Sequence, residues 1–296
     1  MAKVQQAWQT RMQGDIHGIA RYYTDKDDMQ HIIVASSSGS LHEMHWNKQG
    51  GLSSPQPLQQ FDKLTYLASL YSPVDDYQHV IVATREGGLF DVFFNQSHTP
   101  QSRTLFNQLL VASVNIGMAG FYSPNDKVCH AVVLSREGKL HDVTFSQQQS
   151  PVSNEFPIQF DLKNVASLAG FFSPGDDRCH VTIAFTDGRI FDVHYPSQQQ
   201  KFASVSFLGD SGEKILIVAA FFSPDRNSHH VVVRTKDGGI YDYSHSIQGK
   251  SEKILSTPSP LSDIVDVGGY HSASDGNHHI VIATRSGNLY DFYYPL

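Results

Sequence analysis

Long apolar runs and an excess of positive charge are both missing from this 296-residue chain. Without an apolar stretch of about 18 residues, no segment is expected to insert into a membrane as a helix. The formal net charge of −7 argues against nucleic acid as a partner, because phosphate binding requires a basic face. Residues 1–9 lack the apolar core of a secretory signal. We therefore expect a cytoplasmic protein, or one exported without a recognisable signal peptide.

Cysteine is scarce as well, since only Cys129 and Cys179 occur. They hold the same position in neighbouring copies of a repeat described below. Equivalent points on neighbouring units are expected to lie farther apart than the Cα separation of roughly 7 Å that a disulfide allows. We therefore predict two free thiols, which are typical of a reducing compartment.

The chain is built instead from one motif that occurs six times. A histidine is followed after eight residues by glycine, after ten by leucine or isoleucine, and after twelve by an acid. The histidines are His31, His79, His130, His180, His230 and His279. The acids are Glu43, Asp91, Asp142, Asp192, Asp242 and Asp291. Repeats of about 49 residues fill the whole chain, which predicts a single domain over 1–296.

Each repeat reads as four short strands with turn residues between them. The second strand is apolar on both faces, so it is expected to be covered on both sides. Short strands at regular spacing predict an all-β fold, a six-bladed β-propeller with four-stranded antiparallel blades. The repeat cores lie near 18–46, 67–95, 117–146, 168–196, 218–246 and 267–296.

The two ends of the chain complement each other. The last repeat stops after its third strand, at Tyr293 to Leu296. The first repeat is preceded by an unused segment, Val4 to Thr10, within residues 1–14. We predict that this N-terminal segment supplies the missing fourth strand and closes the ring, which removes an open sheet edge.

The turn before the third strand decides which residues share a face. A two-residue turn would require positive φ at Asp187, where other repeats carry Glu or Ser. A three-residue loop with a bulge requires positive φ only at Gly188. That loop places Asp192 opposite Thr182, on the same face as His180. Histidine and acid are then expected about 7 Å apart, facing a cleft between blades.

The spacing resembles that of the six-bladed fucose-binding lectins of fungi and bacteria. In that family a basic residue opens the second strand and a carboxylate follows twelve residues later. Both contact sugar hydroxyls between blades, and aromatic rings stack on the sugar. The resemblance implies that the twelve motif residues are ligand-binding. The family's arginine is replaced here by histidine, and the only tryptophans are Trp8 and Trp46.

The residues alone also allow a structural role for these pairs, because a histidine and a carboxylate satisfy each other when buried. One histidine and one acid per cleft are too few ligands for a metal ion, so neither metal nor cofactor is predicted. In two repeats a second histidine, His229 or His278, precedes the motif, and no role is predicted for it.

Three classes of function follow. The first is a carbohydrate-binding, lectin-like protein whose repeated clefts bind glycans or glycoproteins multivalently. The second is a non-catalytic scaffold that binds a protein partner through one propeller face. The third is a propeller enzyme with a site on the central axis. The chain is not expected to be an enzyme, because six near-equal pairs replace the single asymmetric constellation of a catalytic site, and the sequence has neither Gly-x-Ser-x-Gly nor a phosphate loop.

Overall fold

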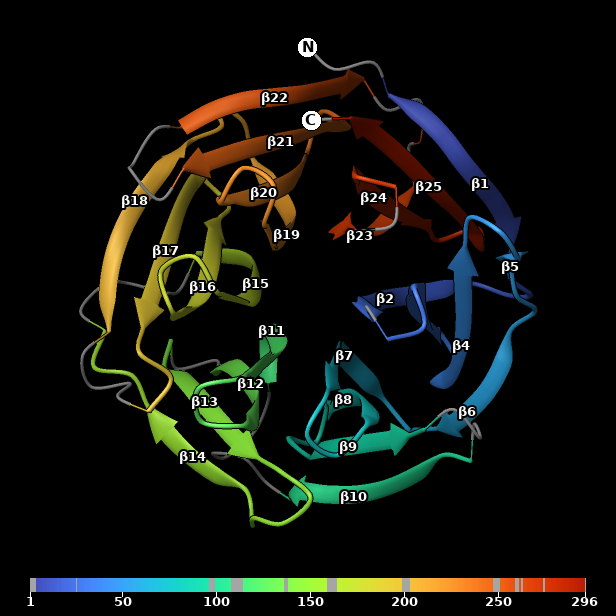
Figure 1. The fold of residues 1–296 in the computed structure, drawn as a ribbon, viewed down its shortest axis with the longest axis vertical. Coiled ribbons are helices and arrows are strands. Elements are labelled where there is room, and N and C mark those ends of the chain that lie inside the picture. Colours follow the sequence, from blue (N-terminus) through green and yellow to red (C-terminus); the bar gives the residue numbers. More distant parts are fainter. Residues whose placement is uncertain are drawn as a thin grey trace.

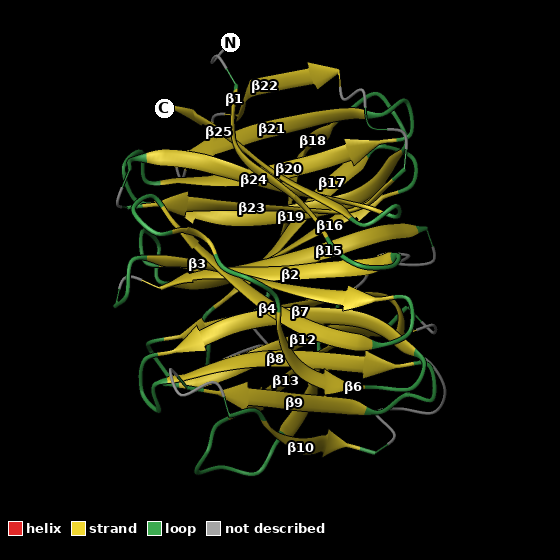
Figure 2. Cartoon of the chain, turned by 90° about the vertical axis from the view of Figure 1, so that its right-hand side faces the viewer, coloured by secondary structure: helices red, strands yellow, loops and turns green. Residues whose placement is uncertain are grey.

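The computed structural model consists of strands joined by turns (Figure 2). The residues it describes are 4–24, 26–95, 99–107, 114–135, 138–158, 164–198, 203–246, 251–258, 261, 263–273 and 275–295. For 114–116 and 251–258 only the backbone is described. No helix in these ranges has the length and hydropathy of a membrane span.

Six antiparallel sheets are arranged as a ring of blades (Figure 1). Blade 1 contains β2 (Ile16–Thr24), β3 (Met29–Ser36), β4 (Ser40–Asn47), β5 (Gly51–Leu52) and β6 (Gln56–Gln60). Blade 2 contains β7 (Leu64–Ser72), β8 (Tyr77–Thr84), β9 (Leu89–Phe94) and β10 (Gln101–Phe106). Blade 3 contains β11 (Val114–Ser123), β12 (Val128–Ser135), β13 (Leu140–Phe145) and β14 (Val152–Glu155).

The second half of the ring repeats this pattern. Blade 4 contains β15 (Val165–Ser173), β16 (Arg178–Phe185), β17 (Arg189–Tyr195) and β18 (Ser204–Asp210). Blade 5 contains β19 (Ile215–Ser223), β20 (Ser228–Thr235), β21 (Gly239–Ser246) and β22 (Ser251–Pro258). Blade 6 contains β23 (Ile264–Ser272), β24 (Asn277–Thr284), β25 (Asn288–Pro295) and β1 (Gln5–Arg11). The predicted six-bladed propeller is confirmed.

The N-terminal strand closes the ring, as predicted. Strand β1 pairs antiparallel with β25, with Trp8 opposite Asp291 and Thr10 opposite Leu289. The Met12 amide extends the ladder by donating to the Gly287 carbonyl at 2.8 Å. Figure 1 shows β1 along the outer edge of the last blade. The outer edge of β25 is therefore paired rather than open to solvent.

Blade 1 differs from the predicted four strands. Its fourth strand is divided into β5 and β6, which both pair with β4. Between them lie Ser53 to Pro55, and Pro55 has no amide hydrogen to continue the ladder. The outer strand is the position where such a break removes the fewest hydrogen bonds.

Small residues let the innermost strands approach one another around the axis. Strands β2, β7, β11, β15, β19 and β23 surround the centre of Figure 1. A Cβ added to Gly120 would lie 3.0 Å from the Cβ of Ala68, and one added to Gly170 would lie 3.0 Å from the Cβ of Ala119. Even the methyl group of alanine would therefore require the neighbouring strand to shift at these points.

The apolar core lies between the blades. Each hydrophobic cluster draws residues from two neighbouring blades, and the second strands are buried on both faces, as at Val80 to Ala83. Cys129 and Cys179 lie in this core as free thiols, as predicted.

The turn after the second strand has the predicted three-residue form. Gly188 has φ of 102°, and its amide donates to the Phe185 carbonyl at 3.0 Å. Thr182 lies opposite Asp192, so the predicted register is confirmed. This register brings each motif acid onto the same face as its histidine.

Candidate binding site at the blade interfaces

Histidine and acid are joined by a direct hydrogen bond in every repeat. The distance from histidine Nδ1 to the nearest carboxylate oxygen is 2.9 Å for His31–Glu43, 3.0 Å for His79–Asp91, 3.0 Å for His130–Asp142, 2.8 Å for His180–Asp192, 3.0 Å for His230–Asp242 and 2.9 Å for His279–Asp291. We call these six units the motif pairs. The side chains bridge the diagonal of the hairpin that the sequence predicted.

A second carboxylate faces the other nitrogen of the ring in five blades. These loop acids stand four residues before each histidine, in the turn between the first two strands. The Nε2 to carboxylate distances are 3.5 Å for Asp27, 3.4 Å for Asp75, 3.3 Å for Asp126, 3.1 Å for Asp176 and 3.2 Å for Asp275. In blade 5, Arg226 holds that position, and His230 Nε2 lies 3.0 Å from the Ser228 hydroxyl instead.

Two carboxylates around one imidazole favour its charged form. Burial lowers the pKa of His130, but the charge of Asp142 and the hydrogen bond to Asp126 outweigh this, and the pKa is raised to about 9. The pKa of His79 and that of His279 are likewise raised to about 9. Burial raises the pKa of Asp126, yet the bond to His130 lowers it overall. These histidines are therefore cations at neutral pH.

All twelve residues of the motif pairs are buried. Asp192 is the most exposed of them, at 6%. On one side, a ring of the first strand covers the histidine, as Phe121 does with its centroid 5.0 Å from that of His130. On the other side lies the next blade, from which Tyr195 donates its hydroxyl to Asp142 at 3.2 Å. That the motif pairs contact a ligand stays a prediction.

The residue fifteen positions after each histidine packs against the pair of the preceding blade in several interfaces. Phe145 lies with its ring centroid 6.0 Å from that of His79, Trp46 lies 5.7 Å from His279, and the Tyr294 hydroxyl donates to Asp242. The interfaces are packed by these rings. The position can be found from the sequence spacing, but only the packing of the blades shows that its side chain contacts the neighbouring blade.

The interface between blades 6 and 1 combines a motif pair with two partly exposed aromatic rings. Trp46 from β4 and Tyr293 from β25 each have a ring centroid 5.7 Å from that of His279. Within the described ranges, Asp291 Oδ1 has no hydrogen-bond partner. Burial raises the pKa of Asp291, against the hydrogen bond from His279.

Blades 2 and 3 enclose a cation that the sequence did not reveal. Arg103 from β10 donates through Nε to Asp91 at 3.0 Å and through Nη1 to the Ser146 carbonyl at 2.8 Å. Its guanidinium lies over the rings of Phe93 and Phe145, at 5.6 and 5.5 Å. The outer strands lack the regular repeat, so no pattern in the sequence indicated this residue.

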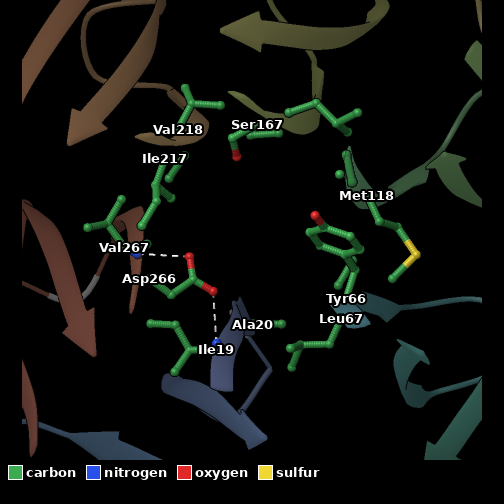
Figure 3. A pocket seen from close by; sticks show the side chains of 18 of the residues that line it. Ile19, Ala20, Tyr66, Leu67, Met118, Ser167, Ile217, Val218, Asp266 and Val267 are labelled. Carbon is green, nitrogen blue, oxygen red and sulfur yellow. Dashed lines mark hydrogen bonds between the residues drawn. The ribbon is translucent and has the colours of Figure 1, made fainter. Parts of the chain in front are cut away.

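A cavity of about 380 Å³ lies on the axis, lined by the innermost strands of all six blades (Figure 3). Asp266 accepts hydrogen bonds there from the amides of Ile19 and Val267, both at 2.9 Å. Desolvation raises the pKa of Asp266 to about 6. An enzyme site on the central axis, the third class of function above, would lie in this cavity. That such a site exists stays a prediction.

No protein-family model matches this sequence, and no curated protein matches it. Solved structures do. The SapL1 lectin in complex with alpha methyl fucoside has a TM-score of 0.66 at 9% identity, over 93% of this chain and 90% of that one. AofleA from Arthrobotrys oligospora has a TM-score of 0.66 at 12% identity, over 96% and 85%. The BP39L lectin from Burkholderia pseudomallei has a TM-score of 0.64 at 12% identity, over 93% and 94%. The chain thus shares the fold of these proteins.

Proposed function

We propose that this chain is a non-enzymatic, carbohydrate-binding protein that takes glycans or glycoproteins at the interfaces between its blades. Two of the structures that share its fold are lectins, and one of them holds alpha methyl fucoside. The observation that carries the proposal is the interface between blades 6 and 1, where partly exposed aromatic rings flank a motif pair.

The chemistry of this interface suits a sugar. The faces of Trp46 and Tyr293 offer apolar surface to the C–H groups of a pyranose, and aromatic rings bury large areas with few degrees of freedom. Asp291 Oδ1 is an acceptor without a partner among the described residues, and a hydroxyl group is a matching donor. An apolar surface with a few placed polar groups is typical of small-molecule sites.

A glycan array tests the proposal, followed by titration with the best glycan and with alpha methyl fucoside. Trp46→Ala is expected to weaken binding about tenfold, because one stacking ring is lost. The matched control is Phe207→Ala, which removes an exposed ring from the outer strand β18. An array without signal at high protein concentration would overturn the proposal. Unchanged binding by Trp46→Ala would move the site to another interface.

A protein partner is the second candidate, and one surface favours it. Val205 and Phe207 are 42% and 59% exposed, and they stand two residues apart on the edge strand β18, hence on one face. Exposed apolar residues on an edge strand are suited to pairing with another chain. Loss of a captured partner on Val205→Lys, with the glycan array silent, would favour this reading.

A further inference from the structure

Blade 4 has a second histidine, His194, whose Nδ1 lies 3.3 Å from the acid of its motif pair. Asp192 and His194 stand two residues apart on β17, so they share a face. His180 lies directly opposite His194 on the neighbouring strand β16. Two imidazoles and one carboxylate therefore project from one rigid hairpin toward blade 5.

The distances bring three donor atoms together. His180 Nδ1 lies 2.8 Å from Asp192 Oδ2, and His194 Nδ1 lies 3.3 Å from the same oxygen. One ligand atom from each of the three residues lies within 4.8 Å of the other two. Imidazole nitrogens with a carboxylate oxygen form the donor set of zinc and its neighbours among the divalent transition metals.

A fourth residue supports His180 from behind. The Asp176 carboxylate lies 3.1 Å from His180 Nε2, the nitrogen that faces away from Asp192. Asp176 is held in the turn after β15, where Asp177 has φ of 63°. A metal-bound histidine commonly donates its other N–H to a carboxylate, which fixes the orientation of the ring.

The facing surface of blade 5 adds polar atoms that have no partner. His245 is 7% exposed, and its Nε2 has no hydrogen bond among the described residues; nor has Asp192 Oδ1. The His229 ring lies 4.2 Å from that of His180. Buried polar atoms normally have a hydrogen-bond partner or ligand. In the other blades an aromatic residue stands at the position of His245.

We propose that the interface between blades 4 and 5 binds one divalent transition-metal ion of the zinc type through His180 Nδ1, His194 Nδ1 and the Asp192 carboxylate. The ion takes the place of the proton on His180 Nδ1, which is released to solvent. A fourth coordination position is left for water. The sequence did not predict a metal because it counted one histidine and one acid per repeat.

The other blades lack this arrangement. At the position of His194 stand Phe93, Thr144, Ser244 and Tyr293 in blades 2, 3, 5 and 6. Blade 1 has His45, but its Nδ1 lies 3.7 Å from Glu43 Oε1. Between blades 5 and 6, His230, Asp242 and His278 also meet, yet Asp242 Oδ2 already accepts from the Tyr294 hydroxyl.

Titration of chelator-treated full chain with ZnCl₂ tests the site, with calorimetry and the visible spectrum of the Co²⁺ form as readouts. One equivalent of Zn²⁺ is expected per chain. His194→Ala should weaken binding by more than about 100-fold, since even loss of an outer-sphere partner costs about 10–100-fold. Asp176→Asn is expected to weaken Zn²⁺ binding by about 10–100-fold and to alter the Co²⁺ spectrum.

Two controls keep the test decisive. His17→Ala removes an exposed histidine, and His45→Ala removes the equivalent residue of blade 1; neither should change Zn²⁺ affinity. His194 is partly exposed, so its variants are expected to fold, and their melting temperatures verify this. Absence of stoichiometric Zn²⁺ binding, or unaltered binding by folded His194→Ala, would overturn the proposal. No glycan is present, so the outcome is separate from that of the proposed function.

Discussion

A buried imidazolium between two carboxylates is the unit from which this molecule's polar chemistry is built. His130 accordingly faces Asp142 on the next strand and Asp126 in the preceding turn, at 3.0 and 3.3 Å. Because the imidazolium and the Asp142 carboxylate are buried away from water, removing any one of the three groups leaves a buried charge without one of its partners. Sequence spacing predicted the first carboxylate. The second lies in a turn, where Asp is common for its local hydrogen bonds, so its role at the histidine could not be predicted from the sequence.

Removal of one imidazolium is expected to destabilise the fold strongly. His130→Ala leaves the buried Asp142 without its cation, which should lower the free energy of unfolding by about 3–5 kcal/mol. Urea denaturation measures this. The control is Thr144→Ala, at the position opposite His130, for which about 0.5 kcal/mol or less is expected. A loss below about 1 kcal/mol for His130→Ala would instead favour pairs that face water or a ligand.

The same unit makes stability depend on pH in a defined window. The folded pKa of His79, His130 and His279 is about 9, above the ordinary 6.5, so the folded chain binds more protons between these values. This stabilisation is complete below about pH 6.5 and is lost as pH rises through about 9. The melting temperature should therefore fall over that range.

His130→Ala provides the control for the pH profile. The titratable groups near His130 and its carboxylates are Asp142, Asp126, Tyr195 and Cys179. Burial raises the pKa of Tyr195 and that of Cys179, so both stay neutral between about pH 6.5 and 9. The variant lacks one raised histidine, so its melting temperature should decline less steeply between about pH 6.5 and 9. Parallel profiles for both proteins would contradict the assigned pKa.

At the scale of elements, the sequence predicted the features that form within one repeat. It missed the contacts that form between two neighbouring blades. The three-residue loop ending in Gly188 predicted the hairpin register, and that register is observed. Arg103 and His245 act on the neighbouring blade, through the Ser146 carbonyl and the charge of Asp192 respectively, so their roles depend on how the ring packs. Within a single repeat nothing distinguishes them from solvent-facing residues.

Ring closure is the clearest property of an element that truncation can test. Deleting residues 1–12 removes β1, which pairs with β25 from Gln5 to Arg11, and exposes the edge of blade 6. We expect a lower melting temperature and concentration-dependent aggregation, followed by light scattering. Deleting only residues 1–3 leaves β1 in place and serves as the control. Identical melting of the 1–12 deletion and the full chain would show that closure adds no stability.

The whole molecule is six-fold in backbone but not in its interfaces. A tryptophan and a tyrosine mark the interface of blades 6 and 1, Arg103 fills that of blades 2 and 3, and histidines gather between blades 4 and 5. The repeat predicts equal sites, because the motif recurs in every copy. The residues that vary between copies therefore hold the information about function.

Stoichiometry separates equal from unequal sites. We expect fewer than six sugar equivalents per chain in calorimetric titration with the best glycan of the array, because the aromatic flanks differ between interfaces. Trp46→Ala should weaken the tightest class about tenfold. Six equivalents of one affinity would contradict this and support the twelve motif residues as six identical binding sites.

The imidazolium units also make folding a reaction that consumes acid. At about pH 8 an unfolded histidine is mostly neutral, whereas His79, His130 and His279 retain a proton in the folded ring. The pKa of His180 is also raised to about 9, and the four positive charges together reduce the formal −7 to −3. The native protein is thus less anionic than its composition suggests, and folding at this pH should take up protons from the buffer, which a pH indicator in weakly buffered solution measures. Each assembled blade of this kind holds a proton that the solvent regains only when the ring opens.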